Sequence, residues 1–404
     1  MLYLYEFICK DQKKDVPLYK NQITTIQMGK IELKSQIIND EYTEYIYDSF
    51  DIQNKVETSV TIDFDLSEAK KFNWNIGVIY GSSGCGKTSI LRRMGDLSHS
   101  NFDANKPLIS NFNWLTPKEA TFLLTSMGLS SVPTWLRPFH LLSNGEQYRA
   151  EVAYKVSKAQ DGDVILIDEY TSVVDRDVAK AMSYTLQKYI RKTKKRLILA
   201  SCHYDIMEWL MPDWTYSPQK GGALERCDYL RRGKPQIELQ VSRVESDTWN
   251  LFKAHHYLTQ NINKSCKSLL FEWNGKPVGF LGMINQPNKG KSTAMAISRV
   301  VVLPDYQGLG LGVKIAEFSA AIFKANGACN IYIKTVNPAL GEYMEKSNLW
   351  EATGYNGKFR TDPGSNERAK NRLSRRSYNF QYIGESISGY EDLLKPIKEM
   401  RWKN

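Results

Sequence analysis

Hydrophobic and polar positions follow two patterns in the first part of the chain. Residues 58–66 alternate apolar and polar side chains, which predicts antiparallel strands ahead of the main sheet. Farther on, compact apolar runs at residues 75–80 and 164–168 alternate with helical periodicity at residues 87–94 and 177–190. This order of elements is typical of a parallel sheet with crossover helices, so we expect an α/β fold.

A second part of the chain follows residues 217–235 (SPQKGGALERCDYLRRGKP), which are rich in Gly, Pro and charge. This stretch lacks apolar periodicity, and we place a domain boundary at its end. The sequence therefore predicts one α/β domain at residues 1–235 and a smaller α+β domain at residues 236–404. In the smaller domain, short strands surround one glycine-rich turn and one helix at residues 313–325.

The composition is that of a soluble globular protein. Of the 404 residues, 42% are hydrophobic, and 54 Lys and Arg against 44 Asp and Glu give a net charge of +10. No apolar run approaches the roughly 20 residues of a membrane-spanning helix, and residues 1–15 become charged too early for a signal peptide. The six cysteines form no CxxC or CxxxC pair, so we expect neither a zinc site nor disulfides. We expect a cytoplasmic protein without a membrane partner.

The basic excess lies in the C-terminal part of the chain. Residues 236–404 hold 23 basic and 15 acidic residues, or +8, whereas residues 1–235 hold 31 and 29, or +2. Residues 358–376 alone contain seven basic and two acidic residues. Such a segment is either a solvated surface loop or a site of contact with phosphates.

A phosphate-binding loop is predicted at residues 81–88, which read GSSGCGKT and match GxxxxGK[ST]. The motif follows an apolar run and precedes a helix, which are the two flanks that it requires. The glycines let backbone N–H groups turn toward phosphates, Lys87 meets the β- and γ-phosphates, and Thr88 supplies an oxygen to Mg²⁺.

Two acids end a second apolar strand, at residues 163–169 (DVILIDE). A parallel α/β sheet places ligand-binding side chains at the carboxyl ends of its strands. We therefore expect Asp168 to bind Mg²⁺ through water and Glu169 to orient the water that attacks the γ-phosphate.

Residues 142–147 (LSNGEQ) resemble the LSGGQ signature of the ABC ATPase superfamily. Residues 171–175 (TSVVD) look like the D-loop of that family, and residues 200–203 (ASCH) look like the strand that ends in its switch histidine. The resemblance implies an ATP-hydrolysing, ABC-type P-loop domain in which Glu169 and His203 are catalytic and Thr88 and Asp168 hold the metal. It implies contacts with ATP from Gly81, Ser82, Gly84, Cys85, Gly86, Lys87, Thr88, Ser143, Gly145 and Asp175.

One chain carries one set of these motifs, so the resemblance implies two composite sites in an ATP-dependent homodimer. In that arrangement, Ser143 and Gly145 of one copy contact the γ-phosphate that the other copy holds. The chain departs from the family because no glutamine occurs between residues 88 and 143. The open substitutes for the missing Q-loop glutamine are Ser110, Asn111 and Asn113, and the open candidates for stacking on adenine are Tyr45, Tyr47 and Phe50.

The interval between the two ATP motifs is short. From Lys87 to Ser143 it spans 143 − 87 = 56 residues, fewer than the helical subdomain that ABC transporters use to contact membrane partners, which disfavours a transport subunit. Residues 116–119 (TPKE) read as a capping box with proline at the first helical position, opening a helix through Ser126. We expect this helix and a connecting loop to fill the interval.

In the C-terminal domain, residues 297–312 (ISRVVVLPDYQGLGLG) predict a strand, a turn and the start of a helix. They resemble the acyl-CoA-binding motif [QR]xxGxG of the GCN5-related N-acetyltransferases (GNAT). Residues 271–282 look like the central hairpin of that fold with Asn-Gly as its turn, and residues 331–334 like a later strand. The resemblance implies that N–H groups at the helix start hold the pyrophosphate of acyl-CoA, with acetyl-CoA as the expected donor. The expected contacts come from Val301, Val302, Gln307, Gly308, Gly310 and Gly312.

The residues that would carry acyl transfer are less well defined. In a common version of the GNAT fold a tyrosine protonates the leaving thiolate of CoA, and Tyr343 is the best-placed candidate, with a buried structural tyrosine as the alternative. Glu272 and Glu342 are each open as general base or as structural groups.

Residues 335–342 and 255–258, together with the basic segment, are similar to Mom-type phage DNA-modification proteins, which share the acetyltransferase fold and act on adenine in DNA. His255 and His256 could be catalytic, could face the substrate, or could be ordinary hydrogen-bonded residues.

Three functions follow from these motifs. The first is an ATPase whose dimerisation positions an acyl-CoA-dependent transferase that acts on nucleic acid, consistent with the +8 charge of residues 236–404. The second keeps the same chemistry but acetylates a protein lysine or a small amine. The third is a non-catalytic ATP-driven clamp with a degenerate GNAT module, which the missing Q-loop glutamine favours.

Overall fold

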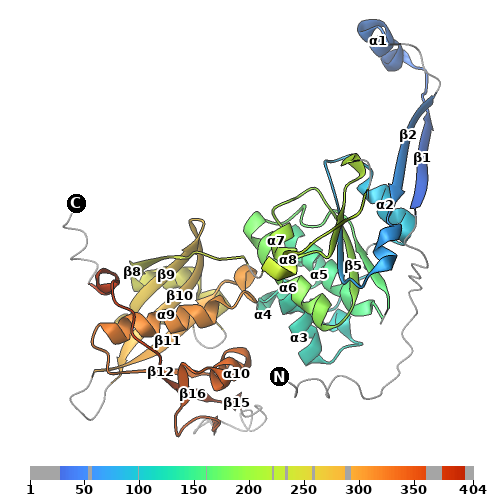
Figure 1. Cartoon of the computed structure of the whole chain (residues 1–404). Helices are drawn as coiled ribbons and strands as arrows, with labels where there is room; N and C mark the ends of the chain where they lie inside the picture. The colour runs from blue at the N-terminus through green and yellow to red at the C-terminus, as the bar shows by residue number, and fades with distance from the viewer. Residues whose placement is uncertain are drawn as a thin grey trace. The chain divides into compact units, whose positions relative to one another are not determined.

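The computed structural model describes residues 28–52, 57–98, 100–160, 162–220, 223–232, 235–256, 260–286, 293–360 and 375–395. The chain divides into two compact units, Met1–Pro235 and Gln236–Asn404 (Figure 1). Most of the basic segment, residues 361–374, lies outside the described residues, as do Tyr257 and Leu258.

The first unit is built on a five-stranded sheet in the order β4-β5-β3-β6-β7. Its first four strands are parallel and β7 is antiparallel, so the predicted α/β fold is confirmed. The strands are β3 (Ile76–Tyr80), β4 (Val164–Ile167), β5 (Arg196–Ser201), β6 (Trp214–Tyr216) and β7 (Glu225–Arg226). They read as apolar runs because successive side chains of each central strand are buried on opposite faces of the sheet.

Helices cover both faces of this sheet. On one face, α3 (Pro117–Ser126), α5 (Asn144–Lys158) and α6 (Arg176–Lys192) share a core with alternate residues of β3, β4 and β5. On the other face, α2 (Lys87–Met94) packs with the remaining residues of these strands and with Trp214. The shorter helices are α4 (Val132–Trp135), α7 (Met207–Leu210), α8 (Tyr229–Arg232) and the 3₁₀ turns η1 (Ser67–Lys71), η2 (Leu108–Phe112), η3 (Phe139–Leu141) and η4 (Pro218–Lys220).

The interval between the ATP motifs contains more structure than predicted. The capping box of α3 is confirmed, because Thr116 N–H donates to Glu119 Oε2 at 2.8 Å and Glu119 N–H donates to Thr116 Oγ1 at 3.3 Å. The prediction of a single helix was wrong, since α4, η2 and η3 also form here. Each of the three begins at or beside a proline, whose fixed φ favours a helical first turn.

The stretch before the predicted domain boundary, which lacks apolar periodicity, nevertheless contains short elements. Pro218–Lys220 form η4, and β7 adds a strand to the first unit by pairing with β6. Short two- and three-residue elements carry no periodic signal, so the composition of the stretch hid them.

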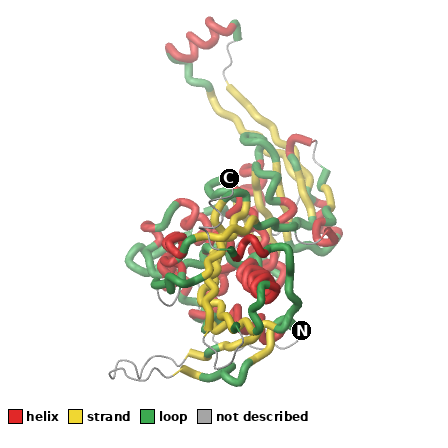
Figure 2. Tube along the Cα trace, turned by 90° about the vertical axis from the view of Figure 1, so that its left-hand side faces the viewer, coloured by secondary structure: helices red, strands yellow, loops and turns green. Residues whose placement is uncertain are grey.

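A hairpin that we call the arm extends from the first unit (Figures 1 and 2). Its strands β1 (Met28–Gln36) and β2 (Glu57–Asp65) pair antiparallel over nine residues, from Met28↔Asp65 to Gln36↔Glu57. The predicted antiparallel pairing is thus confirmed. An additional helix, α1 (Glu41–Phe50), stands at the tip between the two strands.

The second unit is a seven-stranded sheet in the order β13-β16-β12-β11-β10-β9-β8, with a two-stranded ribbon β14-β15 beside it. Its strands are β8 (Gln240–Val244), β9 (Lys267–Trp273), β10 (Lys276–Gln286), β11 (Ala294–Val302), β12 (Asn330–Thr335), β13 (Trp350–Ala352), β14 (Phe359–Arg360), β15 (Arg375–Arg376) and β16 (Tyr378–Tyr382). Its helices are α9 (Leu311–Ala325), α10 (Pro338–Lys346), η5 (Ser246–Leu251), η6 (Lys253–His255), η7 (Pro304–Tyr306) and η9 (Glu391–Leu394). The predicted β9–β10 hairpin is confirmed, and its turn residues Asn274 and Gly275 have the positive φ angles of 51° and 74° that such a turn requires.

Two irregularities interrupt the pairing of the strands at the centre of this sheet. β11 and β12 are parallel, but their pairing ends at Ile297↔Ile333 although β11 continues to Val302. At the same level, the register of β11 with β10 shifts, leaving Ser298 as the extra residue of a bulge. Bulges of this kind often stand beside active sites because they redirect the backbone.

None of the helices in the described part combines the length and the apolar character that crossing a bilayer requires.

The packing of β3 against β6 generates a prediction about stability. A Cβ added to Gly77 would lie 2.0 Å from the indole of the fully buried Trp214, so Gly77→Ala forces the two strands apart. We expect the free energy of unfolding to fall by about 1–3 kcal/mol. Urea denaturation checks this, with Lys118→Ala at an exposed position of α3 as a control that should change stability little. Equal stability of Gly77→Ala and wild type would contradict the packing.

Candidate functional site

Three strand ends in the first unit bring the predicted ATP residues to one edge of the sheet. β5 pairs in parallel with both β3 and β4, so the carboxyl ends of the three strands are adjacent. The phosphate loop and Lys87 follow β3, Asp168 and Glu169 follow β4, and His203 follows β5. Side chains of these types at such an edge can hold the phosphates of a nucleotide and the water that attacks them.

The backbone of residues 81–86 adopts a conformation that can surround a phosphate. Gly84 and Gly86 adopt φ angles of +80° and +93°, which L side chains rarely adopt. Gly86 also lacks room for a Cβ, which would lie 2.6 Å from Ile62 of β2. α2 begins at the next residue without a side-chain cap, leaving N–H groups for an anion.

Lys87 is folded across this loop. Its Nζ donates hydrogen bonds to the carbonyl oxygens of Gly81 at 2.9 Å and Ser82 at 2.7 Å, and Cys85 Sγ lies 3.9 Å from the same ammonium. The ammonium is therefore already positioned over the glycine turn, where phosphate oxygens can replace the two carbonyls.

The acids after β4 stand on an unusual backbone. Glu169 and Thr171 have φ angles of +47° and +68°, which cost free energy in residues other than glycine and occur often at functional sites. Asp168 Oδ1 accepts the N–H of Glu169 at 2.9 Å, so one of its oxygens orients the loop and the other is open to a cation. No cluster of three or more His, Cys, Asp or Glu in the described residues could hold a metal unaided. Mg²⁺ on a nucleotide needs only one or two protein oxygens, which Thr88 and Asp168 can supply.

Ser201 ties the end of β5 to the segment that follows β4. Its Oγ donates to the carbonyl of Tyr170 at 3.0 Å and accepts the N–H of His203 at 3.1 Å, while Tyr170 N–H donates to Ala200 O at 2.7 Å. Burial, followed by the positive charge of Arg176, lowers the pKa of His203 below its usual value although Asp205 acts in the opposite direction. The imidazole is therefore neutral at neutral pH and can accept or donate a hydrogen bond.

The signature residues and the D-loop residues lie together. Ser143 caps α5 in a box with Glu146, whose Oε2 accepts from Ser143 Oγ at 3.0 Å. Burial raises the pKa of Glu146, but hydrogen bonds from Ser143 and Thr134 outweigh it and the pKa is lowered. A Cβ on Gly145 would lie 3.4 Å from the carbonyl of Val173. Asp175 in turn caps α6 by accepting from the N–H of Asp177 at 3.0 Å.

A glutamine that the sequence analysis did not consider reaches the phosphate loop. Gln219 of η4 donates from Nε2 to Ser82 Oγ at 2.6 Å and accepts Ser82 N–H on Oε1 at 3.1 Å. It reaches the loop because β6, which precedes η4, is the neighbour of β3. Among the expected substitutes, the Asn111 amide is occupied by Asp103 N–H and Pro107 O. The available signal was the position of Gln219 just after a strand.

The aromatic residues proposed to stack on adenine are not at this site. Tyr45, Tyr47 and Phe50 lie on α1, at the tip of the arm. Ile62, on strand β2 of the arm, instead contacts the phosphate loop. From Ile62 to the end of β2 at Glu57 the strand extends by about 17 Å. The three aromatic residues are therefore too far away to stack on an adenine bound at the phosphate loop of the same chain. The alternation of apolar and polar residues predicts the strands of the arm but not how far the arm extends.

In the second unit, the predicted acyl-CoA residues form a turn and a helix start. β11 leads through η7 to Gln307, after which Gly308 and Gly310 adopt φ angles of +84° and +80°. Gly310 precedes α9 and no side chain caps the helix, so its first N–H groups can bind an anion. Gln307 Nε2 donates to Val302 O at 2.8 Å, so its amide braces the turn.

The remaining residues expected at this site line the same strand and helix. Val301 and Val302 are buried near the end of β11, and a Cβ on Gly312 would be in ordinary contact with Val302 at 3.6 Å. The start of α9 therefore packs closely against the end of β11, beyond the point where β11 stops pairing with β12.

Tyr343 lies on α10 and is tied to α9. Its hydroxyl donates to Glu317 Oε1 at 3.1 Å, and Lys314 Nζ lies 2.8 Å from Glu317 Oε2. Burial and then the hydrogen bond and charge of Glu317 raise the pKa of Tyr343. The phenol therefore keeps its proton at neutral pH, as a general acid must.

An open cavity of about 1160 Å³ lies along β11, β12, β16 and β13. Its titratable lining residues are Tyr332, Lys334, Glu351, Tyr355 and Lys358. Ser298, the bulge residue, lines it as well, which joins the cavity to the opening between β11 and β12. Glu351 is the carboxylate among the described lining residues, and the sequence analysis missed it because β13 has only three residues.

The other candidates for catalysis lie elsewhere. Glu272 and Glu342 are not among the residues that line the cavity. The His256 ring meets Trp249 edge to face at 5.4 Å between centroids, and His255 is exposed.

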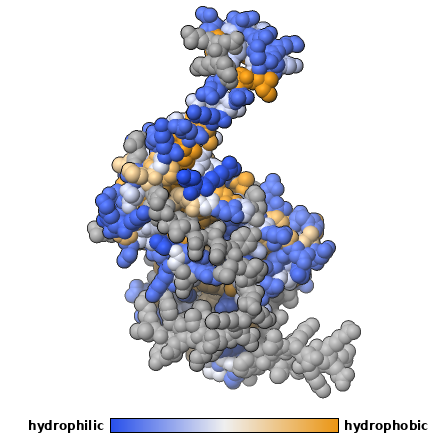
Figure 3. Space-filling model, turned by 90° about the vertical axis from the view of Figure 1, so that its right-hand side faces the viewer, coloured by the Kyte–Doolittle hydropathy of each residue, from blue (hydrophilic) through white to orange (hydrophobic). Residues whose placement is uncertain are grey.

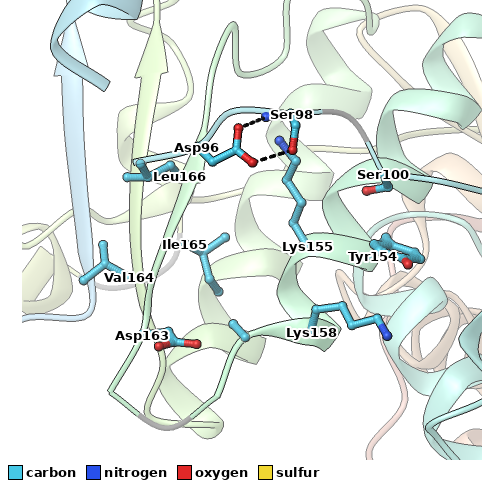
Figure 4. A pocket seen from close by; sticks show the side chains of 11 residues that line it. Asp96, Ser98, Ser100, Tyr154, Lys155, Lys158, Asp163, Val164, Ile165 and Leu166 are labelled. Carbon is cyan, nitrogen blue, oxygen red and sulfur yellow. Dashed lines mark hydrogen bonds between the residues drawn. The ribbon is translucent and has the colours of Figure 1, made fainter. Parts of the chain in front are cut away.

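A smaller cavity of about 80 Å³ lies between α5 and β4 (Figure 4). Asp96 accepts the N–H and hydroxyl of Ser98 at 2.8 and 2.7 Å there, and burial lowers the pKa of Lys155. This volume has room for a few water molecules and is too small for a nucleotide.

Comparison with known proteins identifies part of the second unit. The model of the acetyltransferase (GNAT) family matches residues 204–346, so the C-terminal part of the chain contains a GNAT domain. The match begins inside the first unit, but Trp214–Tyr216 pair with β3, so we assign residues 204–235 to the first unit. No curated protein matches the chain.

Similar solved structures include proteins of two kinds. The ribosomal-protein-S18-alanine N-acetyltransferase of Escherichia coli is 16% identical, with 38% of this chain and 97% of that chain covered and a TM-score of 0.28. Arabidopsis thaliana Naa50, in complex with the bisubstrate analogue CoA-Ac-MVNAL, is 14% identical, with coverages of 37% and 100% and a TM-score of 0.28. The ATP-binding cassette MJ0796, as a dimer bound to ADP and Pi, is 14% identical, with coverages of 42% and 92% and a TM-score of 0.32. At these identities and TM-scores the likenesses carry no argument about activity.

The contact of Gln219 with the phosphate loop generates a prediction. Because both of its hydrogen bonds hold Ser82, Gln219→Ala leaves the start of the loop less ordered, and we expect amide hydrogen exchange in residues 81–86 to quicken several-fold. Hydrogen–deuterium exchange read by mass spectrometry checks this. The neighbouring Lys220→Ala is the control for a general effect of the turn, and unchanged exchange in Gln219→Ala would contradict a positioning role.

Proposed function

We propose that the chain is an ABC-class ATPase joined to an acyl-CoA-dependent N-acyltransferase that acts on nucleic acid. The ATPase part is supported by one observation above all: the phosphate loop, Asp168-Glu169 and His203 follow three adjacent parallel strands. The acyltransferase part is supported by the GNAT match and by the opened sheet beside the helix start at Gly310.

In the proposed ATPase, Lys87 exchanges its two carbonyl partners for β- and γ-phosphate oxygens. Thr88 and Asp168 would hold Mg²⁺, which when bound neutralises phosphate charge. Glu169 orients a water whose oxygen forms a bond to the γ-phosphorus while the bond to the β-phosphate oxygen breaks. The water proton passes to Glu169, and ADP and inorganic phosphate leave. His203, with its lowered pKa, meets the γ-phosphate as a neutral hydrogen-bond donor.

Two copies would complete the nucleotide sites. The start of α5, which holds Ser143 and Gly145, lies beside the D-loop that leads to Asp175, because a Cβ on Gly145 would be 3.4 Å from the carbonyl of Val173. We propose that this surface covers the phosphate loop of a second copy, so that ATP joins two chains and its hydrolysis releases them.

In the proposed transferase, the first turn of α9 binds the pyrophosphate of acyl-CoA and the opening beside Ser298 admits the acyl group. An amine nitrogen of the acceptor attacks the thioester carbonyl, a C–N bond forms and the C–S bond breaks. Glu351 is the carboxylate that can take the amine proton from the cavity, and Tyr343 donates its phenolic proton to the thiolate.

Nucleic acid is the acceptor that the charges favour. Residues 236–404 carry +8, and Lys334 and Lys358 line the cavity. Lysines next to a cavity of this size can contact phosphates on either side of a base that has left its stack.

The proposed role of Glu169 predicts a trapped complex. Glu169→Gln still binds ATP but cannot take the proton of the attacking water, so we expect hydrolysis to fall by about 10²–10⁴-fold and a dimer to persist in saturating ATP. Analytical ultracentrifugation with and without ATP checks this, with Lys87→Ala as the control whose association state ATP should not change. A Glu169→Gln protein whose association state is the same with and without saturating ATP would contradict the composite site.

The proposed acceptor predicts a modified base. Cells that make the protein should contain a modified nucleoside that is lost in Gly310→Glu, because a side chain is strained at φ +80° and a carboxylate at the helix start repels pyrophosphate. Mass spectrometry of nucleosides and of protein lysines checks this. Gly327→Glu adds the same side chain at a similar φ of +87°, just past the other end of α9, and is the matched control that should keep the modification.

Acetyl-CoA binding is measured in the same variants. At about 100 times its dissociation constant, acetyl-CoA should stabilise the wild type by about 2.7 kcal/mol and leave Gly310→Glu unchanged. Acylated lysines with unmodified nucleosides would identify a protein acceptor, and absence of acetyl-CoA binding by the wild type would leave a non-catalytic clamp.

A further inference from the structure

The tip of the arm carries large apolar side chains that the described residues of its own unit leave exposed. Tyr42, Tyr45 and Phe50 of α1 are 79%, 68% and 66% exposed, and no residue of the helix is buried. Figure 3 shows apolar and polar side chains next to one another at this tip. Exposed clusters of large apolar side chains mark interaction sites.

The apolar side chains share one side of α1. Tyr42, Tyr45, Ile46 and Phe50 follow the spacing i, i+3, i+4 and i+8, which places them along one stripe of a helix. The acidic residues of the helix lie on the opposite side by the same spacing: Glu41, Glu44 and Asp48. This is the pattern of a helix that lays its apolar side into a groove of a partner.

The helix is built to keep its shape while exposed. Asp40 Oδ1 accepts the N–H groups of Tyr42 and Thr43 at 3.1 and 2.9 Å, and Thr43 Oγ1 accepts Asp40 N–H at 2.9 Å. Asp51 ends the helix in the left-handed conformation with φ 51°. A ten-residue helix with no buried residue is marginal in water, so a partner surface that buries its aromatic side would stabilise it.

Charge identifies the kind of partner. Residues 39–52 contain five acidic residues and no Lys or Arg, a charge of −5, so the rest of the chain carries +10 − (−5) = +15. An acidic helix is repelled by nucleic acid and by anionic lipid, and it is attracted to a basic protein surface. The remainder of this same chain carries a net positive charge, so a second copy is a partner of that kind.

The paired strands β1 and β2 hold α1 away from the rest of the first unit, which we call the body. Nine paired residues separate its base from its tip, a length of about 30 Å. We propose that α1 docks on the basic body of a second copy of this chain, so that two copies exchange arms about a two-fold axis. The acids steer the encounter, and the buried tyrosine and phenylalanine rings supply the affinity. This dimer does not depend on nucleotide or on the proposed ATPase.

Self-association without nucleotide tests the proposal. Sedimentation equilibrium is measured in the Lys87→Ala background, which removes any dimer that ATP holds. We expect a dimer whose dissociation constant rises at least tenfold in Tyr42→Ser/Tyr45→Ser/Phe50→Ser. The matched control is Leu33→Thr/Val60→Thr, which changes exposed apolar residues of the ribbon and should leave the dimer intact.

Charge and cross-linking separate this arrangement from others. Glu41→Lys/Glu44→Lys/Asp48→Lys and added salt should both weaken the dimer, whereas direct pairing of two acidic α1 helices would be strengthened by salt. A photoreactive residue at position 45 in a mixture of light and ¹⁵N-labelled chains should cross-link the helix of one isotope to the body of the other. A monomer at low salt, cross-links confined to one copy, or cross-links between two α1 helices would each overturn the proposal.

Discussion

Both candidate sites depend on one backbone constraint: a helix that begins directly after a glycine in a left-handed conformation, with no side chain capping it. Gly86 precedes α2 at φ +93° and Gly310 precedes α9 at φ +80°. A helix start of this kind leaves N–H groups without partners, and a bound anion satisfies them better than water does. In each unit a strand delivers the chain to this turn, so sheet and helix together fix where the anion must sit.

The strands around the helix start are arranged differently in the two units. In the first unit, hydrogen bonds from Ser201 join the ends of two strands, so the acids and the histidine are held at one edge with the loop. In the second unit, the strands beside the turn separate and the bulge at Ser298 breaks the ladder. The first candidate site is thus held together by paired strands, and the second is opened by strands that stop pairing.

Local patterns predicted most of the fold but only part of the sites. The capping box at Thr116 and the Asn-Gly turn at Asn274 are local signals, and both formed as the sequence indicates. Gln219 and Glu351 could not be found in that way, because each reaches its site through the neighbour of its strand in the sheet. The position of α1 was equally hidden, since a helix with no buried residue is positioned by the two paired strands that carry it. The contacts that the motifs predict with ATP and acyl-CoA stay predictions.

The base of the arm packs against the phosphate loop. Ile62 occupies the space that a Cβ on Gly86 would need, and β2 also packs against the turn that contains Gln219. The antiparallel residue pairs from Ile31↔Ile62 to Gln36↔Glu57 connect this contact to the tip of the arm. Any partner that displaces the tip would therefore also disturb the packing of Ile62 under Gly86, so the conformation of the glycine turn is coupled to events beyond the end of β2, about 17 Å away.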